Sequence, residues 1–166
     1  MLQCPEEIQD HKGGMKTVTK KQKDFWIGAI VLLYSQYNRI YFDNELEDGV
    51  KINFRKFRRL LGQYHPTGGG ITMDARYIEW MDTPFIKRRA RVMDAMAATL
   101  LHEMLHKYET EVLKINTVHT KRFWASIDKM NGLKFNGFEV RKADARKEND
   151  RKEKEWDTWD DPRIKI

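Results

Sequence analysis

Two histidines and a glutamate near the middle of the chain have the types and the spacing of a hydrolytic metal site. Residues 100–108 read LLHEMLHKY and contain the pattern His102-Glu103-x-x-His106. A separation of four residues puts the two imidazoles one above the other on a helix, where both can bind one tetrahedral ion. The carboxylate beside them then lies within reach of a water on that ion and can act as a general base. The pattern therefore predicts zinc-dependent hydrolysis at this helix.

The sides of this helix differ in a way that suits a buried metal site. Steps of about 100° per residue place the small side chains of Ala95 and Thr99 on the side of His102 and His106. The other side carries mostly larger apolar residues, namely Met93, Ala97, Leu100, Leu101, Met104 and Tyr108. A pattern with three fixed residues also arises by chance, so an alternative remains: a half-buried helix whose histidines are satisfied by hydrogen bonds.

A third metal ligand is available at His119, which opens the segment HTKRFWASIDKM of residues 119–130. Apolar residues recur at helical spacing on the side of His119, and an Asn-Gly pair then ends the pattern. These apolar residues are Phe123, Ile127 and Met130, with Trp124 flanking them. We expect His119 in the first turn of a helix that packs inward, opposite the central helix. His65, before Pro66 in a loop, is interpreted as a surface or rim residue, and His11 as no ligand.

The elements that must position these residues follow from periodicity and breakers. Apolar residues at helical spacing predict a buried helix from Asp24 to about Phe42, followed by a turn at Asp43-Asn44. Three short strands are expected at Val50–Phe54, Leu60–Tyr64 and Ile71–Asp74, forming a small antiparallel sheet. The central helix should start between Pro84 and Arg91 and end near Glu111. The predicted fold class is α+β, with helices packed on this small sheet and the central helix in the middle.

Charge and cysteine content restrict the partners and the kind of metal site. The net charge is +6, and Cys4 is the only cysteine, so a thiolate zinc site and a disulfide framework are excluded. Basic residues gather at 12–23, 51–59 and 87–91, which indicates either contact with a polyanion such as DNA or an ordinary solvated surface. No signal peptide and no apolar run long enough for a bilayer is visible, and we expect a cytoplasmic protein without membrane contact.

Composition also suggests three parts of the chain. Residues 1–23 are expected to be a flexible basic leader, residues 24–138 a single folded domain that contains the metal site, and residues 139–166 a charged tail, helical or disordered. Residues 141–155 of this tail mix both signs of charge, which favours an exposed helix. Trp156 and Trp159 lie beyond it, and the sequence predicts either that they fold back or that they dock on a partner.

With His119 included, residues 24–132 resemble the SprT-like (Spartan-type) zinc metalloprotease family. The resemblance covers the segment from Tyr41 to Leu46, the strand that begins at Ile71, the LLHEMLH core, and His119-x-x-x-Phe123-Trp124. It implies a zincin-like fold, Zn²⁺ bound by His102, His106 and His119, and Glu103 as the general base. It also implies protein substrates bound to or near DNA. The cysteine-rich zinc ribbon of some members is missing, as are recognition peptides for ubiquitin or a sliding clamp. This compact form suggests the cytosol of a bacterium or of a phage-infected host.

Several roles stay open at this stage. A thermolysin-like arrangement would use a downstream glutamate as the third ligand, and Glu139 is the main candidate. Glu109 could orient a ligand imidazole, although an exposed glutamate is the favoured interpretation. The oxyanion stabiliser is unassigned: Tyr108 points to the wrong side of the helix, and Tyr64, His65 and Tyr77 are positional candidates only. Two rival functions are a non-catalytic, zinc-stabilised module that binds DNA or protein, and a basic adaptor without metal.

Overall fold

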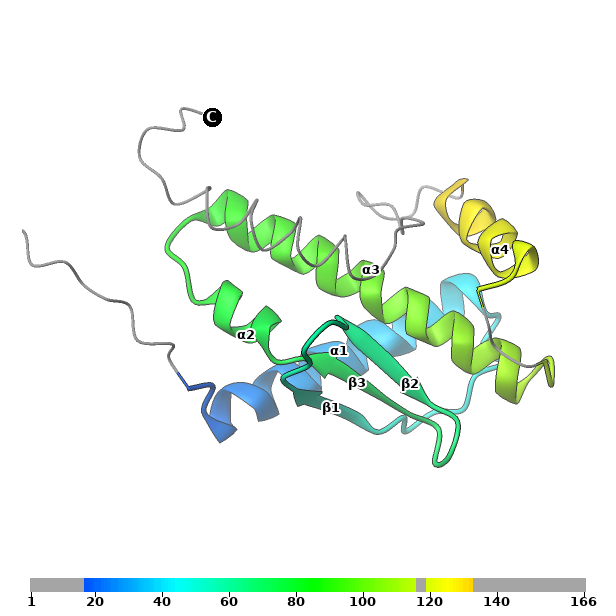
Figure 1. The fold of residues 1–166 in the computed structure, drawn as a ribbon, viewed down its shortest axis with the longest axis horizontal. Helices are drawn as coiled ribbons and strands as arrows, with labels where there is room; N and C mark the ends of the chain where they lie inside the picture. The colour runs from blue at the N-terminus through cyan, green and yellow to red at the C-terminus, as the bar shows by residue number, and fades with distance from the viewer. Residues whose placement is uncertain (1–16, 116–118, 133–166) are drawn as a thin grey trace, which may run out of the picture.

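The computed structural model describes residues 17–115 and 119–132, and within them the fold is α+β, as predicted. The elements in chain order are α1 (Lys20–Tyr41), β1 (Ile52–Arg55), β2 (Gly62–His65), β3 (Gly70–Asp74), α2 (Arg76–Met81), α3 (Ile86–Glu111) and α4 (Lys121–Gly132). Figure 1 shows the long helix α3 running along the sheet, with α4 beside its C-terminal half. In the described part, no helix is sufficiently long and apolar to cross a membrane.

Helix α1 begins four residues before the expected start at Asp24. The reason is a capping box, in which the Thr19 hydroxyl accepts the N–H of Gln22 and the Gln22 side chain accepts the N–H of Thr19. The predicted turn after the helix is confirmed, because Asp43 and Asn44 both adopt positive φ angles of 50° and 59°.

The three predicted strands are present, but the prediction of a purely antiparallel sheet is wrong. The strand order is β1-β3-β2, with β2 antiparallel to β3 and β1 parallel to it. Gly68 and Gly69, at φ angles of 93° and 65°, turn the chain sharply between β2 and β3. Strand β3 therefore returns between the other two and runs in the direction of β1. This arrangement leaves β2 at the edge of the sheet, next to α3.

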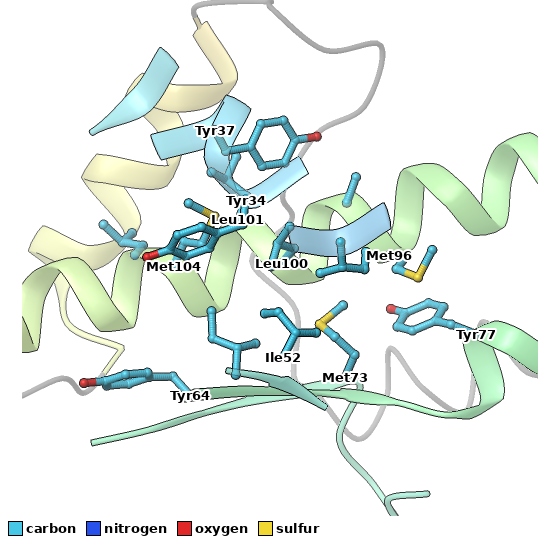
Figure 2. Close-up of a cluster of buried hydrophobic side chains, with 14 of the residues drawn as sticks. Tyr34, Tyr37, Ile52, Tyr64, Met73, Tyr77, Met96, Leu100, Leu101 and Met104 are labelled. Carbon is cyan, nitrogen blue, oxygen red and sulfur yellow. The ribbon is translucent and has the colours of Figure 1, made fainter. Parts of the chain in front are cut away.

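The core lies between the sheet and helices α1 and α3. Figure 2 shows Ile52 and Met73 rising from the strands toward Leu100, Leu101 and Met104 of α3, with Tyr34 of α1 beyond them. Met73 and Leu100 are fully buried. Burying this apolar face holds α3 against the sheet, so the remaining sides of the helix are fixed in direction.

Helix α2 is a single short element that the sequence did not predict. The fully buried Asp74 at the end of β3 accepts hydrogen bonds from the Arg76 backbone N–H and guanidinium, and this ion pair is as short as 2.6 Å. The Tyr77 hydroxyl lies 2.7 Å from the Thr99 hydroxyl of α3. Helix α2 therefore ties the sheet to the middle of α3, one turn before the histidines.

Candidate metal centre

His102 and His106 project from the same side of α3, as their spacing predicts. Their Nε2 atoms are 3.2 Å apart, and both side chains are half-buried. Leu101 and Leu105, each one residue before a histidine, are buried in the core. Since the apolar side of the helix cannot rotate away from the sheet, the two imidazoles cannot turn away from their shared position.

His119 joins them from a separate segment. Its Nε2 lies 2.9 Å from that of His102 and 3.1 Å from that of His106. The prediction that His119 lies in the first turn of the helix is wrong by two residues, because α4 begins at Lys121. The Thr120 hydroxyl accepts the N–H of Phe123, which makes Thr120 the cap and leaves His119 just outside the helix.

The three nitrogens form a triangle that hydrogen bonds among them cannot satisfy. The Nε2 atom of a neutral imidazole is either a hydrogen-bond donor or an acceptor. Among three such atoms at least two are of the same kind, and these two cannot form a hydrogen bond with each other. Around a tetrahedral zinc ion at about 2.0–2.1 Å, three nitrogens lie roughly 3.3 Å apart. The observed separations of 2.9–3.2 Å are close to that value. The three histidines together thus form a group able to hold a metal ion, and their donor set fits zinc.

Aromatic residues of α4 cover one side of this triangle. The buried Phe123 ring stacks on His106 with centroids 4.5 Å apart and meets His102 and His119 edge-on at 5.0 Å each. Trp124 lies 5.2 Å from His119. These contacts restrict the rotation of the imidazole rings and exclude water from that side.

Burial keeps the histidines neutral, which is the form that binds a metal. It lowers the pKa of His102 to about 3, with His106 and His119 contributing through charge repulsion. It lowers the pKa of His106 to about 4, again with a contribution from His119, and it also lowers the pKa of His119. All three imidazoles are therefore neutral at neutral pH, so none has to lose its charge before a ring nitrogen binds a metal ion.

Glu103 is buried on the adjacent side of α3, against strand β2. Its Oε2 atom accepts the backbone N–H of Tyr64 at 2.8 Å. Burial raises the pKa of Glu103 to about 7, and the hydrogen bond from Tyr64 opposes that rise. A carboxyl group that titrates near neutrality can both take up and release a proton, which is the property required of a general base.

Gly62 allows β2 to lie this close to Glu103, and the sequence analysis did not identify it. A Cβ atom at Gly62 would lie 2.6 Å from Cγ2 of Thr99 and 3.0 Å from Cγ of Glu103. The signal was an isolated glycine within a strand pattern, which often marks a close approach of another element.

The positional candidates for the oxyanion role are engaged elsewhere. The Tyr64 hydroxyl donates to Glu111 Oε1 at 3.0 Å, and Tyr77 is fully buried against Thr99. His65 is half-buried, with its Nε2 2.8 Å from the Thr72 hydroxyl. Tyr108 donates to Glu45. The role of oxyanion stabiliser stays unassigned.

The favoured interpretation of Glu109 as an exposed residue is wrong. Only 3% of its surface is exposed, and burial raises the pKa of its carboxyl group, with Arg122 of α4 acting in the opposite direction. Within the described part of the chain, His106 Nδ1 is buried and has no hydrogen-bond partner, so Glu109 does not orient it by a direct bond. Glu139, the alternative third ligand, lies outside the described residues.

Comparison with known proteins agrees with the motif and the fold. No curated protein matches the chain. The model of the SprT-like family matches residues 30–144, which is more than half of the chain and includes the H-E-x-x-H helix, His119 and the sheet. On this match, the chain belongs to the SprT-like family.

Proposed function

We propose that the protein is a zinc-dependent endopeptidase whose metal ligands are His102, His106 and His119 and whose general base is Glu103. The observation that carries the proposal is the triangle of three neutral imidazole nitrogens, 2.9–3.2 Å apart. Two of these histidines lie on α3, where the residue after His102 is the buried Glu103. A site that only stabilised the fold would not require a carboxylate at that position.

Each residue has a defined task in this proposal. The zinc ion, when bound, would supply a Lewis acid that activates water and polarises the peptide carbonyl. His102, His106 and His119 would hold the ion through one ring nitrogen each. Glu103 takes the proton from the attacking water and transfers it to the amine nitrogen that leaves as the peptide bond breaks. Phe123 and Trp124 keep the ligand rings in place.

The proposed substrates are proteins bound to or near DNA. Membership of the SprT-like family and exposed basic residues support this part. In the part of the chain that the structure describes, the exposed basic residues of these clusters are Lys20, Lys21, Lys51, Arg55, Lys56, Arg58, Arg59, Lys87, Arg89 and Arg91. Such a surface attracts phosphates in a salt-dependent way.

The test compares Glu103→Gln with the wild type and with Glu47→Gln, a control that changes an exposed glutamate. Zinc content is measured by mass spectrometry, and cleavage of an unstructured protein is measured with and without single-stranded DNA. We expect about one zinc per chain in all three proteins and cleavage reduced about 10³-fold in Glu103→Gln alone. Zinc-loaded wild type that cleaves nothing, with or without DNA, would favour the non-catalytic binding module.

A further inference from the structure

A row of three charged residues on α3 faces the β2–β3 hairpin, and only the first of them, Glu103, has a role in the proposed metal site. Glu103, Lys107 and Glu111 follow one another at intervals of four, so they lie along one side of the helix. Glu103 binds the backbone N–H of Tyr64, Lys107 Nζ donates to the carbonyl of Gly69 at 2.9 Å, and Glu111 accepts the Tyr64 hydroxyl. This side of α3 is thus bonded to the hairpin at three levels.

Lys107 is the central member of this row and is almost completely buried. Only 2% of its surface is exposed, and its ammonium group lies 2.7 Å from the carboxylate of Glu111. A buried ion pair contributes little net stability compared with apolar residues of the same volume. What such a pair does supply is a fixed geometry, because each charge must keep its partners.

The hairpin is shaped to receive this pair. Gly69 has a φ angle of 65°, and a Cβ atom there would lie 2.9 Å from Glu111 Oε1 and 3.0 Å from Lys107 Nζ. A larger residue would therefore be strained in its backbone and would push the ion pair away. We call Lys107, Glu111 and Gly69 the clamp.

Tyr64 connects the clamp to the proposed base. The partner of Tyr64 in β3 is Ile71, whose N–H donates to the carbonyl of Lys51 on the opposite side of β3. Tyr64 and Ile71 are therefore a pair without mutual hydrogen bonds. The N–H of Tyr64 therefore points away from the sheet, toward Glu103. One residue is thereby held at both ends: its hydroxyl by Glu111 and its amide by Glu103.

We propose that Lys107 and Glu111 are positioning residues that act through Tyr64. They hold β2 at the distance from α3 at which the Tyr64 N–H fixes the carboxylate of Glu103 beside the three histidines. This inference rests on the proposed function of Glu103 as the base. The contact itself can be measured without activity.

The experiment uses the full-length, zinc-loaded protein and three variants. Lys107→Met combined with Glu111→Leu removes both charges together, and Tyr64→Phe removes only the hydroxyl that reaches Glu111. Tyr108→Phe is the matched control, because it removes a hydroxyl bond from α3 to the exposed Glu45. Amide hydrogen exchange at Tyr64 is followed by NMR, with the Asp74 amide, which donates to Leu61, as the internal reference.

We expect Tyr64 to exchange at least about tenfold faster in the double variant and a few-fold faster in Tyr64→Phe, with Asp74 unchanged. Peptidase kcat should fall about tenfold in the double variant, with KM within about twofold and zinc content unchanged. The control should match the wild type in both measurements.

Wild-type protection of the Tyr64 amide in a folded double variant would overturn the inference, and so would an unchanged kcat despite faster exchange. If the double variant does not fold, Tyr64→Phe decides in the same way. If the wild type has no peptidase activity, the proposed function fails, whereas faster exchange in the variants would still support the positioning of Glu103.

Discussion

Two neighbouring sides of helix α3 differ in what they need in order to be stable. The side of His102 and His106 meets His119, and the three nitrogens cannot satisfy one another. The side of Glu103, Lys107 and Glu111 meets the β2–β3 hairpin, where each of these side chains has a hydrogen-bond partner. One side can therefore be completed by a cation, whereas the other is completed by the fold itself.

This difference predicts different consequences of mutation. Changes on the histidine side should reduce metal affinity and leave folding nearly intact. Changes on the hairpin side should alter stability and geometry and leave metal binding nearly intact.

The largest effect is expected for His119→Ala. Zinc affinity should fall at least about 100-fold, since even residues that only support a ligand cost 10–100-fold. His119 is exposed and lies outside α4, so the free energy of unfolding of the metal-free protein should change by less than about 1 kcal/mol. Zinc titration against a competing chelator and urea unfolding measure the two quantities.

His65→Ala is the matched control, because this histidine contacts Thr72 and not the triangle. Its zinc affinity should equal that of the wild type. If His119→Ala retains full affinity, the third ligand lies elsewhere, and Glu139 becomes the first residue to test.

The second effect is expected for Gly62→Ala on the hairpin side. Its methyl group would lie 2.6 Å from Cγ2 of Thr99, which separates β2 from α3 and should cost about 2 kcal/mol in the free energy of unfolding. Gly28→Ala is the control: space is open around Gly28 in α1, so alanine should stabilise the protein by about 0.5–1 kcal/mol. Urea unfolding of metal-free protein measures both.

The assignment of this steric clash to the methyl group of Thr99 can be checked directly. Thr99→Ser removes the clashing methyl group and keeps the hydroxyl that lies beside Tyr77. Combined with Gly62→Ala, it should restore part of the lost stability, which is a non-additive effect. Strict additivity would contradict the proposed close approach.

The histidine side of α3 could be predicted from the sequence because its signals are local. Spacing of four residues fixes which side chains share a helix side, and the buried apolar pattern of α3 runs from Val92 to Leu105. The helix itself was predicted with an end near Glu111, as observed. His119 was predicted to complete the site from an apolar pattern in its own segment, and the structure does bring it to His102 and His106.

The hairpin side could not be predicted, because its signals depend on distant residues. Lys107 and Glu111 at a spacing of four have the pattern of an ordinary exposed pair, but Lys107 is buried beside the hairpin and Glu111 is half-buried there. Glu109 was placed in solvent, although it is buried and lies near Arg122 of α4. The parallel pairing of β1 with β3 was missed for the same reason, since short strands carry no information on which strand lies between the others.

The last prediction concerns a difference in pH dependence between the two sides of α3 in metal-free protein. The folded pKa of His102, about 3, lies below its ordinary value of 6.5. The unfolded chain therefore binds more protons below pH 6.5, and stability falls as the pH decreases toward 3. The pKa of His106, about 4, acts in the same direction.

Glu103 acts in the opposite direction, because its folded pKa of about 7 lies above its ordinary value of 4.5. Its contribution is fully present below pH 4.5 and is lost as the pH rises through 7. Relative to metal-free wild type, Glu103→Gln should therefore gain about 3 kcal/mol in the free energy of unfolding between pH 4.5 and pH 8. Urea unfolding at both pH values measures this gain. A constant difference would mean that Glu103 titrates normally in the folded protein, and that strand β2 does not bury it.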